Sequence, residues 1–172
     1  MPVQRLNHAV LYVRDVARSH AFYRDVLGFR VKMEIPGAAV FLQAEGSTND
    51  HDLGLFQIGA GAGASEAGRR TVGLYHLAWE VDTLAELRRI EAKLIELGAL
   101  VGESDHATTK ALYAQDPDGL EFEVSWLLPA ELITPEVAEG AAITAPLDLA
   151  REIERYGAET RGGVGVSVPA PA

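Results

Sequence analysis

Hydrophobic and polar residues alternate in a pattern that occurs twice along the chain. The first copy opens with the strand pattern HAVLYV from His8, and the second opens with HLAWEV from His76. In each copy an aspartate (Asp15, Asp82) then precedes a helical pattern, and a capping aspartate is typical of a helix start. Apolar residues recur at helical spacing after both aspartates. In the first helix these are Val16, Phe22, Tyr23, Val26 and Leu27, and in the second they are Leu84, Leu87, Ile90, Leu94, Ile95 and Leu97.

Both helices are predicted to end at a glycine, Gly28 and Gly98, because glycine readily takes the left-handed conformation that ends a helix. Three strand patterns follow each glycine. They cover residues 29–35, 38–44 and 52–58 in the first copy, and 99–103, 110–115 and 120–127 in the second. The order βαβββ therefore occurs twice and predicts an α+β domain.

The repeat predicts a domain over residues 4–128, made of modules at about 4–58 and 72–128. Between them, the glycine- and alanine-rich stretch 59–70 is expected to be a flexible loop. A C-terminal extension, residues 129–172, differs in composition. We expect it to be extended over 130–145, helical once over 147–156, and disordered from 161 to its end. No second domain is predicted.

Composition excludes several classes of function. The net charge is −10 with no run of lysine or arginine, so a nucleic-acid partner is not expected. The chain has no cysteine, which rules out disulfides and thiolate metal sites. No apolar run approaches the roughly 20 residues of a membrane span, and the N-terminus lacks the features of a signal peptide. These patterns predict a cytoplasmic protein with no membrane partner.

The segment 105–124 brings three chemically useful side chains onto one predicted hairpin: His106, Tyr113 and Glu123. Its turn, residues 116–119, reads Asp-Pro-Asp-Gly, in which proline and glycine suit the conformations of a tight reversal. After the turn, side chains alternate, so that Glu123 faces away from its apolar neighbours. Taken alone, this strand favours a solvated acid at Glu123.

The repeat changes that interpretation, because it places His8 and His76 at equivalent positions of equivalent strands. A lone histidine on a strand is more often a core residue, but a matched pair beside Glu123 predicts a metal site. Two imidazoles and one carboxylate, with several positions left open, suit non-haem Fe(II). The same ligands can hold Mn(II), Zn(II) or Ni(II), since ligand type alone does not determine the metal.

Two motifs, FYRDVLGFRV from Phe22 and DPDGLEFEV from Asp116, resemble those of the vicinal oxygen chelate superfamily. That superfamily includes glyoxalase I, bleomycin-resistance proteins, methylmalonyl-CoA epimerase and type I extradiol dioxygenases. Within it the chain is most similar to catechol 2,3-dioxygenase-like extradiol enzymes. The resemblance implies a single domain with an open, incomplete β-barrel around the site. An open half-barrel with an apolar edge favours a homodimer.

The resemblance also implies roles for individual residues. His8, His76 and Glu123 match the family's metal ligands. His51, in the pattern His-Asp-Leu-Gly-Leu, matches its acid/base histidine, while His106 and Tyr113 match the histidine and tyrosine beside the substrate oxygens. These roles make chemical sense, since a catechol must lose protons to chelate a metal and histidine titrates near neutral pH. Hydrogen-bond donors can also stabilise the charge that develops on oxygen.

Three hypotheses for function follow. The first is an Fe(II)-dependent extradiol dioxygenase that inserts O₂ into a catechol-type aromatic diol. The second is another metal enzyme of the same fold, a glyoxalase-like lyase or an epimerase. Such enzymes use a fourth protein ligand on the last strand of the first copy, where this chain has only Gln57 nearby. The third is a metal-free protein that sequesters an antibiotic or another small molecule, which needs no set of metal ligands.

Overall fold

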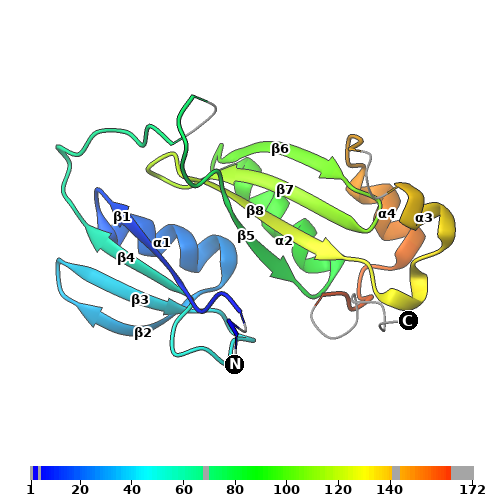
Figure 1. Cartoon of the computed structure of the whole chain (residues 1–172), viewed down its shortest axis with the longest axis horizontal. Helices are drawn as coiled ribbons and strands as arrows, with labels where there is room; N and C mark the ends of the chain where they lie inside the picture. Colours follow the sequence, from blue (N-terminus) through cyan, green and yellow to red (C-terminus); the bar gives the residue numbers. More distant parts are fainter. Residues whose placement is uncertain (1, 4, 68–69, 141–143, 164–172) are drawn as a thin grey trace. The chain divides into compact units, whose positions relative to one another are not determined.

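The computed structural model of the protein describes residues 2–3, 5–67, 70–140 and 144–163 (Figure 1). Helices and strands follow the predicted order βαβββ twice and form two four-stranded sheets. The chain divides into two compact units, residues 1–66 with 116–119, and residues 67–115 with 120–172. Neither sheet closes into a barrel, since each runs in a linear strand order with two open edges. The α+β prediction is thus confirmed.

The first unit packs one helix on one face of its sheet. Its elements are β1 (Ala9–Val13), α1 (Val16–Leu27), β2 (Arg30–Ile35), β3 (Ala39–Gln43) and β4 (Leu53–Gln57). The strand order is β1-β4-β3-β2, and only the β1–β4 pair is parallel. The core lies between α1 and the sheet because alternate strand residues point toward the helix. The opposite face of the sheet is not covered by α1.

The second unit repeats this plan. Its elements are β5 (Leu77–Val81), α2 (Leu84–Glu96), β6 (Leu100–Asp105), β7 (Thr109–Gln115) and β8 (Glu121–Leu127). The order β5-β8-β7-β6 matches that of the first sheet, with β5 and β8 parallel. Phe122, Val124 and Trp126 of β8 are buried toward α2, as their alternation with Glu121 and Glu123 predicted. The acidic residues of β8 therefore lie on the sheet face opposite α2.

Two details of the helices differ from prediction. Asp15 caps α1 as expected, accepting a hydrogen bond from Arg18 N at 3.0 Å. The cap of α2, however, is Thr83 and not Asp82, because the Thr83 hydroxyl accepts from Glu86 N. Both predicted glycines take positive φ, 72° at Gly28 and 63° at Gly98. The apolar stripe of the second helix ends at Leu94, since Ile95 and Leu97 are 59% and 48% exposed.

The C-terminal extension contains more helix than predicted. The helix expected over 147–156 is α4 (Leu149–Tyr156), which packs against α2. An extended chain over 130–145 is wrong for its first part, where a 3₁₀ turn, η1 (Ala130–Leu132), and α3 (Pro135–Gly140) form. Thr134 and Pro135 explain α3, because the Thr134 hydroxyl accepts from Val137 N and proline suits the first helical position. Most of the predicted disordered end, residues 164–172, lies outside the described residues.

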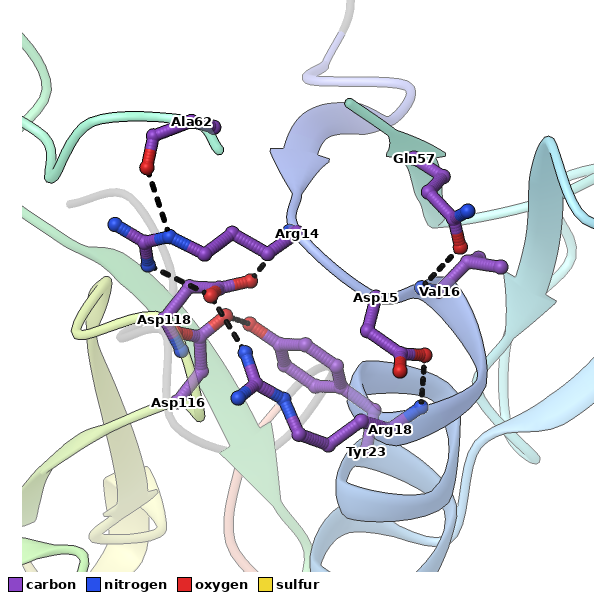
Figure 2. Close-up of polar contacts among 9 residues, drawn as sticks. All are labelled: Arg14, Asp15, Val16, Arg18, Tyr23, Gln57, Ala62, Asp116 and Asp118. Carbon is purple, nitrogen blue, oxygen red and sulfur yellow. Dashed lines mark hydrogen bonds and ion pairs between the residues drawn. The ribbon is translucent and has the colours of Figure 1, made fainter. Parts of the chain in front are cut away.

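The Asp-Pro-Asp-Gly turn joins β7 to β8, yet its residues pack within the first unit (Figure 2). Gly119 has φ of 82° and its N–H donates to Asp116 O at 2.9 Å, which confirms the predicted reversal. Asp118 accepts from Arg14 N and Arg14 Nη1, both at 2.9 Å, and from Arg18 Nη2 at 2.6 Å. The hydroxyl of the buried Tyr23 donates to Asp116 at 3.2 Å. Helix α1 and the residues before it therefore hold the tip of the β7–β8 hairpin.

Within the described residues, no helix combines the length and apolar character needed to cross a membrane.

Candidate active site

His76 and Glu123 lie side by side on neighbouring strands of the second sheet. His76 comes just before β5, and Glu123 lies in the middle of β8. The His76 Nε2 atom is 3.3 Å from Glu123 Oε2, and both side chains are largely buried. His76 Nδ1 is buried and has no hydrogen-bond partner among the described residues. Two side chains that commonly bind metals thus share one place, and one ring nitrogen remains unsatisfied there.

Tyr113 lies beside this pair because β7 places it directly opposite Glu123 in the antiparallel register. Its ring centroid is 5.8 Å from that of His76. Burial, then the negative charge of Glu123 and the neighbouring Tyr75, raises the pKa of the Tyr113 phenol above its ordinary value of 10.0. A hydrogen bond to the Glu123 carboxylate acts in the same direction. The phenol is therefore protonated at neutral pH and can donate a hydrogen bond.

His106 completes this group from the turn between β6 and β7. Its backbone N–H donates to Thr109 O at 2.9 Å, and Thr108 N donates to His106 O at 2.7 Å. This tight turn directs the His106 ring toward β7, where its Nε2 atom is 3.2 Å from the Tyr113 hydroxyl. The second unit by itself therefore gathers four of the predicted site residues on one sheet face: His76, His106, Tyr113 and Glu123.

A cavity of about 440 Å³ opens beside Tyr113 and His106. Its volume falls within the range of small-molecule sites, roughly 300–1,000 Å³. Tyr75 and Val101 supply apolar surface, while Gln115 and Glu121 supply polar groups. The described residues that line it include no lysine or arginine, so its fixed charge is negative. Such a lining suits an aromatic ring without an acidic substituent.

In the first unit, His8 and His51 lie together for a similar reason. They come just before the parallel neighbours β1 and β4, where Ala9 pairs with Leu53. Their ring centroids are 4.5 Å apart, and the Phe41 ring packs edge-on against His51 at 5.1 Å. His8 Nδ1 is 2.7 Å from Asn7 Oδ1, which accepts its proton and leaves Nε2 free to bind a metal. His51 Nδ1 is 3.0 Å from Asp50 Oδ2.

The matched registers also show what the first unit lacks. Two residues after His76, Ala78 pairs with Glu123, and two residues after His8, Val10 pairs with Gly54. Gly54 thus occupies the position that corresponds to Glu123, and it has no side chain. The amide oxygen of Gln57, the polar residue that ends the same strand, accepts from Val16 N at 3.1 Å. The first unit therefore offers no carboxylate at the place that matches Glu123.

The predicted residues thus fall into two groups, one in each unit. Among the described residues, no group of three or more His, Cys, Asp or Glu side chains is gathered closely enough to hold a metal. The completion of the His76–Glu123 pair by His8 accordingly stays a prediction.

Sequence reasoning missed three residues at the second unit's site: Tyr75, Glu121 and Thr144. The sequence could have indicated Glu121, because it lies two residues before Glu123 on the same strand and so shares its face. Tyr75 was indicated less strongly, by its position directly before His76. Thr144 lies in the extension, and no periodicity or spacing connects it to the site.

Residues 5–124 match the Glyoxalase/Bleomycin resistance protein/Dioxygenase superfamily. The catechol-2,3-dioxygenase of Bacillus subtilis (strain 168) is 35% identical over 120 residues, which are 69% of this chain and 40% of that protein. The biphenyl-2,3-diol 1,2-dioxygenase 3 of Rhodococcus globerulus is 36% identical over 124 residues, 70% of this chain and 62% of that protein. The chain thus spans less than two thirds of the length of these relatives.

Solved structures share the fold. The lactoylglutathione lyase of Agrobacterium tumefaciens superposes with a TM-score of 0.53 at 24% identity, covering 73% of this chain and 95% of that one. An identity this low supports the fold and not the activity. The match over residues 5–124 confirms the predicted resemblance: the chain belongs to the Glyoxalase/Bleomycin resistance protein/Dioxygenase superfamily.

Proposed function

We propose that the protein is an extradiol dioxygenase that cleaves the ring of a catechol-type aromatic diol with O₂. One observation carries the proposal: His76, Glu123, Tyr113 and His106 lie on one sheet face, the last two beside a cavity of about 440 Å³. The relatives named for catechol and biphenyl-diol dioxygenase activity support the same class of reaction. Both reactants are small, and neither requires a charged binding site.

The donor groups fit a divalent metal. We assign His8, His76 and Glu123 as its ligands, with Fe(II) as the preferred ion and Mn(II), Zn(II) or Ni(II) as alternatives. His8 keeps Nε2 available because Asn7 engages Nδ1, and His76 has a ring nitrogen without a partner among the described residues. When bound by two histidines and one carboxylate, Fe(II) supplies the redox chemistry by which O₂ reacts with an aromatic diol.

The remaining residues handle protons and hydrogen bonds. His51 is assigned as the base that takes a proton from a diol hydroxyl, with the Asp50 carboxylate beside its Nδ1 atom to stabilise the charged ring. The Tyr113 hydroxyl donates to Glu123 in the structure, and we assign it to donate instead to an oxygen of the bound diol that gains negative charge. His106 donates in the same region.

Gly54 argues against a glyoxalase-like lyase or an epimerase with a fourth protein ligand. The position that matches Glu123 has no side chain, and the nearby Gln57 amide is engaged by Val16. A protein that only sequesters a ligand would not need the ionisable group around Glu123. Both alternatives can be tested. A lyase or epimerase would turn over its substrate without O₂, and a sequestering protein would bind its ligand tightly without metal.

The test is anaerobic reconstitution with Fe(II), followed by admission of O₂ in the presence of a panel of catechols. We expect a stoichiometric metal content, O₂ uptake, and the yellow colour of a muconic semialdehyde-type product. Glu123→Gln should lower metal affinity by about ten-fold or more, because a charged ligand is lost, while Glu80→Gln on the adjacent strand β5 serves as the matched control. No O₂ uptake by fully metal-loaded protein with any catechol would overturn the proposal.

We further propose a homodimer. The edge strand β2 leaves Val31, Met33 and Ile35 44–52% exposed, although all three are apolar. Sedimentation velocity should give the mass of two chains, and a single-chain mass at micromolar concentration would contradict the proposal.

A further inference from the structure

Among the described residues, the C-terminal extension touches the candidate site through one side chain, Thr144, which lies beyond the region 5–124 that matches the family. The Thr144 hydroxyl is 3.3 Å from Nδ1 of His106. The other ring nitrogen of His106, Nε2, is 3.2 Å from the Tyr113 hydroxyl. Both nitrogens of the His106 ring are therefore engaged, one by the extension and one by the sheet.

The position of Thr144 is fixed by its neighbours. Ala145 and Asp105 pair as an isolated β-bridge, with N–H to O distances of 2.8 and 2.9 Å in the two directions. The Asp105 carboxylate also accepts from Lys110 Nζ at 2.6 Å, and Lys110, which is buried, pairs with Glu152 of α4 at 2.9 Å. A buried ion cluster thus anchors the extension to the residue that directly precedes His106.

The turn that carries His106 is also strained. Ala107 has φ of 61°, which is the one positive value for a residue other than glycine in the part of the chain that the structure describes. Alanine takes this conformation rarely, and such strain persists only where the surroundings impose it. Here the Asp105 carboxylate accepts from Ala107 N at 2.8 Å. The same aspartate therefore stabilises the strained turn and holds the segment that bears Thr144.

We propose that Thr144 is a positioning residue that fixes the tautomer and the orientation of His106. The direction of each hydrogen bond follows from Glu123. A carboxylate only accepts, so the Tyr113 hydroxyl donates to Glu123 and must accept from His106 Nε2–H. In a neutral imidazole Nδ1 is then an acceptor, and the Thr144 hydroxyl donates to it. The ring is held with its Nε2–H directed at the group around Tyr113.

This arrangement has a consequence for the reaction, which rests on the proposed function. A donor aimed at the substrate side stabilises oxygen only if it keeps its proton and its direction. Without Thr144 the ring can rotate and Nδ1 can carry the proton instead. The extension would thereby supply this chain with a contact that the matched region does not contain.

The test uses the full chain with ¹⁵N-labelled histidine, metal-free and at a pH where His106 is neutral. Nitrogen NMR should show His106 protonated at Nε2, with the Nδ1 signal at the shift of a hydrogen-bond acceptor. The two signals are assigned to His106 by their loss in His106→Gln. In Thr144→Val, which keeps the shape and removes the hydroxyl, the Nδ1 signal should move to that of an unbonded nitrogen. Thr144→Ser should restore it. With Fe(II) and a catechol, kcat should fall about ten-fold in Thr144→Val at unchanged KM, the loss expected for one hydrogen bond.

A His106 ring protonated at Nδ1, or an Nδ1 signal unchanged in Thr144→Val, would overturn the inference. Unchanged kcat in an active Thr144→Val protein would likewise refute the positioning role. If no variant or wild-type protein consumed O₂ while the nitrogen signals behaved as predicted, the proposed function would fail and the assignment of Thr144 would stand.

Discussion

The contact between Asp118 and the two arginines of the first unit allows us to predict how much the free energy of unfolding falls when it is removed. Asp118→Asn keeps the shape of the side chain but removes its charge (Figure 2). The Asp118 side chain is only 6% exposed and accepts three hydrogen bonds from Arg14 and Arg18. Hydrogen bonds to charged groups contribute about 1.5–3 kcal/mol each. Because the arginines are 27% and 48% exposed and water can solvate them again, we expect a net loss of about 2 kcal/mol.

A loss of that size should lower the midpoint of thermal unfolding by about 4–8 °C for a chain of this length. Circular dichroism is the assay, because it reports both units, whereas Trp79 and Trp126 both belong to the second. Asp25→Asn is the matched control: Asp25 pairs with Arg24 at the surface and should change stability by less than about 0.5 kcal/mol. Equal effects of the two substitutions would refute the reasoning.

The pH dependence of Asp118→Asn provides a second check. Burial acts to raise the pKa of Asp118, but the hydrogen bonds from Arg14 and the charge of Arg18 outweigh it, and the pKa lies below its ordinary value of 3.8. A lowered carboxyl pKa stabilises the folded state above the unfolded pKa and ceases to do so as pH falls through the folded one. The difference between wild type and Asp118→Asn should therefore be full at neutral pH and shrink below pH 3.8.

Two further substitutions test the hairpin anchor and the cavity. Tyr23→Phe removes the buried hydrogen bond to Asp116 and should cost about 1 kcal/mol in urea unfolding. Burial and then Asp116 raise the Tyr23 pKa well above 10.0, so the advantage of wild type over Tyr23→Phe should be full below pH 10.0 and be lost as pH rises beyond that value; an advantage that stays constant at alkaline pH would contradict this. In the cavity, Glu121→Gln should raise kcat/KM for a carboxylated catechol relative to a neutral one about five-fold, because a like charge costs about 1 kcal/mol there. An unchanged ratio would show that Glu121 does not face the substrate.

Much of the fold followed from periodicity, because each strand and helix buries one face. The alternation around Glu123 and the spacing of Leu84, Leu87 and Ile90 were sufficient to predict β8 and α2. The cap of α2 was mistaken because Asp82 and Thr83 are both good caps, and only the backbone at Thr83 decides between them. Exposure at Ile95 could not be predicted either, since an apolar residue near a helix end fits the pattern whether or not something covers it.

Some residues of the candidate site could likewise be predicted from the sequence, and others could not. His76, Tyr113 and Glu123 come together because they lie on adjacent strands whose register the repeat indicates. Thr144 reaches the site through a bridge and an ion cluster formed by residues distant in sequence, so no local pattern signals it. The lack of an acid on the last strand of the first copy could be predicted from the sequence, but the assignment of Gly54 as the residue that matches Glu123 needs the register of the structure.

We propose that the protein cleaves an aromatic diol with O₂ beside its hydroxyl-bearing carbons. The most direct measurement is mass spectrometry of the product formed from catechol and ¹⁸O₂ by the Fe(II)-loaded full chain. We expect a ring-opened product, formed with equimolar O₂ consumption and carrying label from O₂. A ring-intact product, or product formed without label and without O₂ consumption, would refute the proposed reaction.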